Sequence, residues 1–92
     1  MRERTVTVRN ALGMHARAAA RFVHAAGAFQ CRVTVAREDR GDRHVDGKSI
    51  LGLLLLAAAR GVILRITADG ADEEEGLGVL CRLVASGFGE AP

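Results

Sequence analysis

A histidine and an arginine stand two positions apart at the start of an expected helix, in the segment Gly13-Met14-His15-Ala16-Arg17. The first turn of a helix has unpaired backbone N–H groups and a partial positive charge, so it suits an anion such as phosphate. A histidine there can be both the nucleophile and the carrier of a phosphoryl group. The guanidinium of Arg17 matches phosphate oxygens in charge and geometry. Together, His15 and Arg17 predict phosphoryl relay.

Ser49 is a second candidate, because it directly precedes the apolar run from Ile50 to Ala59. A serine in this place is expected to cap a helix by accepting a backbone N–H. Its hydroxyl can also take a regulatory phosphate, whose negative charge the helix start would tolerate. Local sequence leaves both interpretations open: a cap alone, or a cap that is also a regulatory site.

The helix expected over residues 50–60 carries leucines on every side. Only one face can contact a sheet, so some of these leucines must lie outside it. They either pack under the last helix or form a docking patch, since exposed apolar clusters often mark partner surfaces. Leu51 and Leu54, which are neighbours on a helix, are the candidates for such a patch.

Apolar periodicity predicts seven elements in the order strand, helix, strand, strand, helix, strand, helix. The expected strands cover residues 5–9, 32–36, 44–45 and 62–68, and the helices cover 15–27, 50–60 and 72–86. A charged turn is expected over residues 37–43. Alternating strands indicate a sheet with one wet face, so the three helices must cover the other. This predicts an α+β fold, an open-faced β-sandwich with a four-stranded antiparallel sheet.

Composition limits the function. The 92 residues predict one domain over 1–92, with a net charge of +2, three Phe and no Tyr or Trp. An RNA-binding module with the same element order would need a basic or aromatic sheet face, which is lacking, so we expect no nucleic-acid partner. No secretory signal or membrane-length apolar run is visible, which predicts a cytoplasmic protein without membrane insertion. The three histidines lack metal-ligand spacing.

Two segments resemble the signatures of the HPr family, the histidine phosphocarriers of the bacterial phosphotransferase system, which includes the nitrogen-branch NPr proteins. Residues 10–17, Asn-Ala-Leu-Gly-Met-His-Ala-Arg, are similar to the active-site signature, and residues 47–52, Gly-Lys-Ser-Ile-Leu-Gly, to a serine-centred one. The resemblance covers nearly the whole chain. One departure is Ala18, where the family usually has proline. This change should cost about 0.4–1 kcal/mol of stability without removing a reactive group.

The resemblance implies a role for each matching residue. His15 would accept a phosphoryl group on Nδ1 from phosphorylated enzyme I and pass it to an enzyme IIA-type domain, with Arg17 stabilising the phosphate. Ser49 would be the target of an ATP-dependent serine kinase and its phosphorylase. Partner contacts would fall on Ala16, Ala20, Leu51, Gly52 and Leu54. We expect a monomer without cofactor or metal and without independent turnover.

Two questions stay open at this point. The first is whether the chain is a relay, or a regulatory relative that works mainly through Ser49. The second is whether a relay would serve sugar uptake or a nitrogen-type regulatory branch. The signature around His15 slightly favours the nitrogen-type branch, whereas the signature around Ser49 favours sugar uptake.

Overall fold

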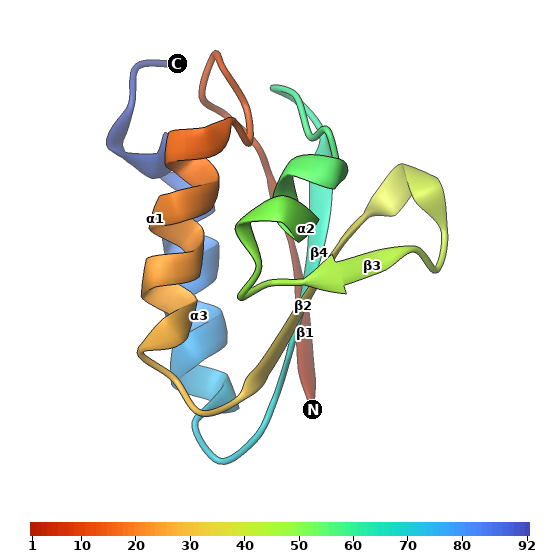
Figure 1. Cartoon of the computed structure of the whole chain (residues 1–92), viewed down its shortest axis with the longest axis vertical. Coiled ribbons are helices and arrows are strands. Elements are labelled where there is room, and N and C mark those ends of the chain that lie inside the picture. Colours follow the sequence, from red (N-terminus) through yellow and green to blue (C-terminus); the bar gives the residue numbers. More distant parts are fainter.

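Four antiparallel strands form one sheet, and the α-helices cover one of its faces (Figure 1). The computed structural model describes all 92 residues. The strands are β1 (Arg2–Thr7), β2 (Arg32–Arg37), β3 (His44–Asp46) and β4 (Ile63–Asp69), and the helices are α1 (Ala16–Gly27), α2 (Ile50–Leu55) and α3 (Glu73–Ala85). Two 3₁₀ turns, η1 (Glu38–Arg40) and η2 (Gly87–Gly89), complete the chain. The predicted element order and open-faced sandwich are confirmed.

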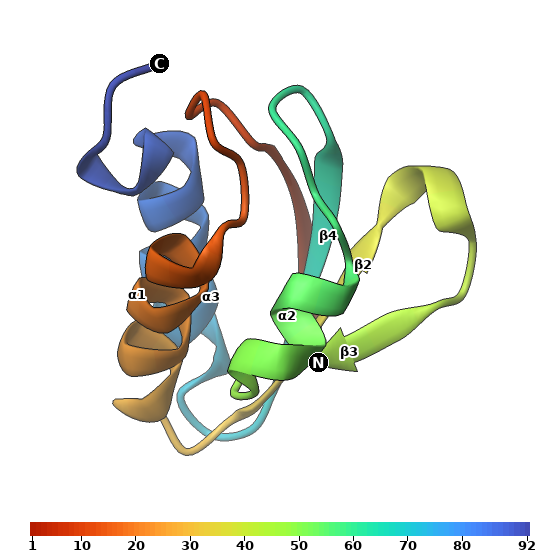
Figure 2. The ribbon, with the colours of Figure 1, turned by 45° about the horizontal axis from the view of Figure 1, so that its top comes forward.

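The sheet has the strand order β1-β4-β2-β3, so the first and last strands of the sequence pair directly. The central pair sets the register of the core, with Val35 opposite Ile66 and Val33 opposite Ala68. All four of these side chains are buried. Their alternation with exposed or half-buried neighbours is the pattern of a sheet covered on one face. On that face, α1 lies against both α2 and α3, and α2 also contacts β3 (Figure 2).

The prediction that the second helix extends to residue 60 is wrong. Helix α2 ends at Leu55, and Ala57 has a φ of 50°, in the left-handed region. The Nη1 of Arg37 donates to the carbonyl oxygens of Leu56 and Ala57, at 3.2 and 3.1 Å. The carbonyl of Ala58 then accepts from the backbone N–H of Met14, at 2.9 Å. The apolar run continues past Leu55, but these tertiary hydrogen bonds hold the carbonyls outside a helix.

Ala57→Gly should stabilise the protein, because alanine is strained at positive φ and glycine is not. We expect a gain of about 0.5–1 kcal/mol in the free energy of unfolding. Ala59→Gly is the matched control: Ala59 is exposed and has no positive φ, so glycine there should destabilise slightly. Urea denaturation of both variants tests this, and a loss of stability in Ala57→Gly would contradict it.

Strand and helix ends differ from the prediction by a few residues. β1 spans Arg2–Thr7 rather than residues 5–9, because β4 pairs with its whole length, from Arg2 opposite Ala68 to Thr7 opposite Ile63, including residues that lack apolar alternation. Asp72, expected in the first turn of the last helix, is its N-cap residue but makes no side-chain cap. Its carboxylate instead accepts from the backbone N–H groups of Gln30 and Cys31, at 2.8 and 2.9 Å, just before β2.

No helix of this fold combines the length and the hydrophobicity that a bilayer crossing requires.

Candidate functional site

His15 is the N-cap residue of α1. Its backbone is extended (φ −77°, ψ 178°), and Nδ1 of its ring accepts from the backbone N–H of Arg17 at 3.3 Å. Because a backbone amide can only donate, this contact requires a lone pair on Nδ1. The predicted histidine at a helix start is therefore confirmed, and its Nδ1 points toward the first-turn amides.

The loop before α1 fixes the position of His15 through a close backbone contact. Gly13 has a φ of 64°, and the N–H of Met14 is bonded to Ala58. A β-carbon at Gly13 would lie 2.5 Å from the carbonyl oxygen of Ala58. Only glycine tolerates both the positive φ and this approach.

Gly13→Ala should therefore destabilise the protein and displace His15. The left-handed backbone costs an alanine about 1 kcal/mol, and relief of the clash with Ala58 adds about 1–3 kcal/mol. Chemical denaturation measures the loss, and the ring resonances of His15 report its displacement. Gly41→Ala, at a backbone that also favours glycine (φ 62°, ψ −126°) but with open space around it, is the control for a backbone cost without a clash. Equal losses in the two variants would contradict this account.

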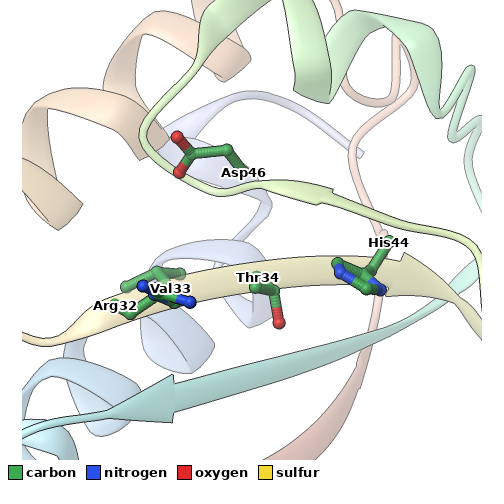
Figure 3. A pocket seen from close by; sticks show the side chains of 5 residues that line it. All are labelled: Arg32, Val33, Thr34, His44 and Asp46. Carbon is green, nitrogen blue, oxygen red and sulfur yellow. The ribbon is translucent and has the colours of Figure 1, made fainter.

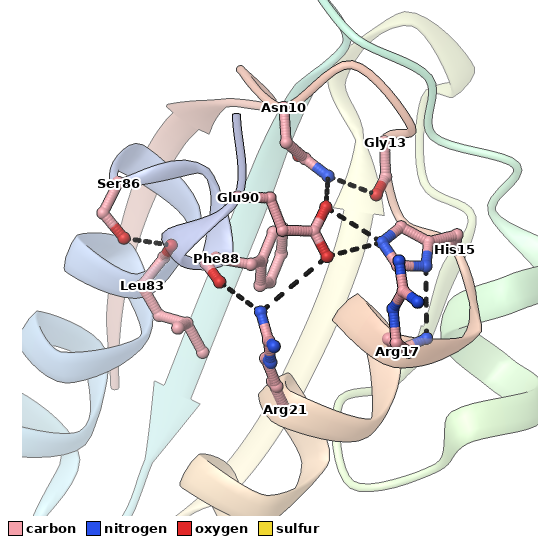
Figure 4. Close-up of polar contacts among 9 residues, drawn as sticks. All are labelled: Asn10, Gly13, His15, Arg17, Arg21, Leu83, Ser86, Phe88 and Glu90. Carbon is pink, nitrogen blue, oxygen red and sulfur yellow. Dashed lines mark hydrogen bonds and ion pairs between the residues drawn. The ribbon is translucent and has the colours of Figure 1, made fainter. Parts of the chain in front are cut away.

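A carboxylate that sequence reasoning did not identify lies against the other ring nitrogen of His15. The Glu90 oxygens Oε1 and Oε2 are 3.0 and 2.8 Å from Nε2 (Figure 4). Both side chains are partly covered, with 20% of His15 and 17% of Glu90 exposed. Since Nδ1 already accepts a hydrogen bond, Nε2 must carry the proton and donate it to Glu90. The two contacts together select one neutral tautomer of the ring.

The C-terminal segment that carries Glu90 is held against α1 by several groups. Nδ2 of the fully buried Asn10 donates to Glu90 at 3.0 Å and to the carbonyl of Gly13 at 2.8 Å. Arg21 donates to the carbonyl of Phe88 and lies 3.8 Å from the Glu90 carboxylate. The ring of Phe88 is buried in the core. We call residues 87–92 the C-terminal strap.

The electrostatics of Glu90 reflect these neighbours. Partial burial by itself raises the pKa of its carboxyl, but hydrogen bonds from Asn10 and His15 and the positive charge of Arg17 outweigh burial. The net effect holds the pKa of Glu90 below its ordinary value. A carboxyl with a lowered pKa stabilises the fold above its unfolded pKa, and this contribution is lost as the pH falls through its folded pKa. The contact with His15 therefore involves an ionised carboxylate near neutral pH.

Arg17 is exposed, and its backbone N–H, not its guanidinium, makes the hydrogen bond to His15. It lies in the first turn of α1, two residues after the N-cap His15. An anion held at Nδ1 would thus meet the first-turn amides and a free guanidinium of the same turn. The structure brings His15 and Arg17 together, as the sequence predicted, and adds Glu90.

The expected leucines lie on the surface rather than under the last helix. Leu51 is 68% exposed and Leu54 is 37% exposed. Ile50 and Leu55 are exposed as well, and we call these four side chains of α2 the apolar patch. α2 lies against α1, whose Ala16 and Ala20 are also exposed. Gly52 differs from the other partner candidates, since it is half-buried and a β-carbon there would be 3.3 Å from Val45 of β3.

Ser49 caps α2 as predicted, with Oγ accepting from the N–H of Gly52 at 3.1 Å. The preceding Lys48 donates through Nζ to the carbonyl of Phe29, at 2.6 Å, and so ties this turn to the segment after α1. Ser49 itself is half-buried.

The largest surface pocket lies outside the candidate site, at the β2–β3 edge of the sheet (Figure 3). It has a volume of about 470 Å³ and contains no residue of the candidate site. Its lining consists of Arg32, Val33, Thr34, His44 and Asp46. Nowhere in the chain do three His, Cys, Asp or Glu side chains converge as metal ligands would.

Comparison with known proteins agrees with this geometry. Residues 2–86 match the family model described as the PTS HPr component phosphorylation site. The chain is 41% identical over 90 residues to the phosphocarrier protein HPr of Neisseria meningitidis serogroup A, covering 98% of each chain. It is 44% identical over 85 residues to the phosphocarrier protein HPr of Pseudomonas aeruginosa, covering 92% of each.

Among solved structures, the crystal structure of HPr-C-His from Thermoanaerobacter tengcongensis matches with a TM-score of 0.91 and 37% identity, over 100% of both chains. The family model, the relatives and the solved structure all match this chain over nearly its full length. The chain belongs to the HPr family of phosphocarriers of the phosphotransferase system.

Proposed function

We propose that His15 accepts a phosphoryl group on Nδ1 from phosphorylated enzyme I and passes it to an enzyme IIA-type domain. The observation that carries this proposal is the orientation of the ring. Nδ1 holds its lone pair at the start of α1, whereas Nε2 is occupied by Glu90. Family membership supports the phosphotransferase system as the setting.

The transfer is a displacement at phosphorus. The Nδ1 lone pair forms the new P–N bond, and the bond between phosphorus and enzyme I breaks with its electrons returning to enzyme I. The phosphoryl oxygens then lie where the first-turn amides and the Arg17 guanidinium can donate to them. The reverse displacement at the same phosphorus delivers the group to the acceptor, so the chain ends each cycle unchanged.

Incubation with phosphoenolpyruvate and a cognate enzyme I tests this proposal. We expect one phosphate per chain that is labile in acid and stable in base. Nitrogen-15 NMR of labelled histidine should assign it to Nδ1 of His15. A phosphate on Nε2, on another residue, or none at all would overturn the proposal.

The apolar patch is proposed to dock both partners. A small apolar surface suits contacts that must form and dissociate in every cycle. Leu51→Ser combined with Leu54→Ser should raise the KM of enzyme I for this carrier about tenfold or more, as expected when interface anchors are lost. Stability should change little, because both side chains are exposed. Ile63→Ser, at an exposed apolar residue of β4, is the control. An equal KM in all three proteins would contradict the assignment.

A second function, regulation through Ser49, is favoured by its place two residues before Leu51. We propose that an ATP-dependent serine kinase modifies Ser49 and that the added charge weakens docking at the apolar patch. A phosphate brings a charge of about −1.5 to −2, which an apolar interface would have to desolvate. Incubation with ATP and the family's serine kinase, followed by mapping of the phosphate, tests this, with Ser49→Ala as control. Absence of label on Ser49 would leave that residue with its capping role alone.

A further inference from the structure

Glu90 contacts the one ring nitrogen that phosphoryl transfer does not use. Its carboxylate oxygens lie 2.8 and 3.0 Å from Nε2 of His15. Two other groups lie against the same carboxylate, and neither belongs to the strap. Asn10 comes from the loop before α1, and Arg21 comes from α1 itself, with its guanidinium 3.8 Å away. A glutamate that only happened to lie near His15 would not be expected to have both a fully buried amide donor and a guanidinium beside it.

The buried Asn10 shows how firmly Glu90 is placed. Its Nδ2 uses one N–H on Gly13 and the other on Glu90. The loop that carries His15 and the strap that carries Glu90 are thus bridged by a single side chain (Figure 4). Only the amide nitrogen could serve, because both partners are acceptors.

We infer that Glu90 is a positioning residue, whose carboxylate retains the Nε2 proton of His15 and thereby directs the Nδ1 lone pair toward the incoming phosphorus. This inference rests on the proposed function of His15. A histidine held by a carboxylate on one nitrogen and reactive on the other is the arrangement that fixes tautomer and ring orientation in hydrolase triads.

Charge gives Glu90 a role in both directions of transfer. When Nδ1 bonds to phosphorus while Nε2 keeps its proton, the ring becomes positively charged. An adjacent carboxylate stabilises that developing charge. On delivery, the retained proton lets the ring leave as neutral imidazole instead of an imidazolate anion. Loss of the carboxylate should therefore slow both loading and unloading.

Three substitutions separate charge from alignment. Glu90→Gln keeps an oxygen acceptor but removes the charge, Glu90→Ala removes both, and Glu90→Asp keeps the charge on a shorter side chain. Loss of a group that orients a metal-binding histidine typically costs about 10- to 100-fold in affinity or activity, and we expect a loss of the same order for this histidine. We expect kcat for phosphorylation by enzyme I to fall by that factor in Glu90→Ala and less in Glu90→Gln, with KM little changed. Glu90→Asp should recover part of the rate. Glu75→Gln, at an exposed acid of α3, controls for net charge.

The second measurement reports on the ring without enzyme I. Long-range ¹H–¹⁵N spectra of the neutral ring should show the Nε2–H tautomer in the wild type and a larger Nδ1–H population in Glu90→Ala. The difference in rate between the wild type and Glu90→Ala should also shrink at acidic pH, where the carboxylate of Glu90 in the wild type becomes protonated. Wild-type rates and an unchanged tautomer in folded Glu90→Ala would overturn the inference. If the wild type takes no phosphate at all, the proposed function fails, and the tautomer spectra still test Glu90 separately.

Discussion

His15→Ala should abolish the acid-labile phosphate that phosphoenolpyruvate and enzyme I add to this chain. The imidazole supplies the only lone pair directed at the first-turn amides of α1, and alanine has no group that can bond to phosphorus. We expect no label above background after prolonged incubation, measured by mass spectrometry under basic conditions. This is the largest functional effect predicted for any single substitution in the chain.

The loss of label has to be separated from a loss of structure. His15 also caps α1, and a lost cap costs about 1 kcal/mol. His15→Asn restores a capping side chain without a nucleophilic nitrogen, so it should fold well and still take no phosphate. His24→Ala removes an exposed histidine from the same helix and should be labelled normally. Normal labelling of His15→Asn would remove His15 from the reaction, and loss of label in His24→Ala would show that the loss is not specific to His15.

The sequence predicted those parts of the site whose residues lie close together along the chain. Gly13, His15 and Arg17 lie within five consecutive residues, and the change from loop to helix there follows from glycine and the apolar spacing. The N-cap position of Ser49 could be predicted for the same reason, whereas His15, expected as the first residue of the helix, is its N-cap. The strands were predicted by alternation, although their ends shift where a partner strand starts or stops.

The sequence could not predict Glu90, because 75 residues separate it from His15. No periodicity connects the two, and the contact depends on how the strap folds back over α1. One signal was present: the segment Gly87-Phe88-Gly89-Glu90 places one of only three phenylalanines between glycines, after the last helix. Likewise, the end of α2 depends on Arg37, which lies 19 residues from Leu56. Long-range hydrogen bonds of this kind override local propensity.

Phe88→Ala should produce the largest loss of stability that also reaches the site. The ring is 2% exposed and belongs to the core. Its backbone has a φ of 57°, a conformation costing a non-glycine residue about 1–2 kcal/mol, so burial of the ring must outweigh that strain. Truncation of a buried phenylalanine costs about 3–5 kcal/mol, a large share of the about 5–15 kcal/mol that stabilises a typical domain. Urea denaturation should show this loss.

The same substitution should loosen the strap before the whole chain unfolds. Phe88 anchors the strap in the core, and Arg21 holds its carbonyl two residues before Glu90. Well below the melting temperature, we therefore expect Phe88→Ala to reproduce the slow phosphorylation of Glu90→Ala. Phe29→Ala is the matched comparison, because this half-buried phenylalanine packs near Gly76, outside the strap. It should lower stability while leaving the rate per folded molecule unchanged. Equal rates in the two variants would mean that the strap does not set the geometry of His15, even if Phe88 stabilises the fold.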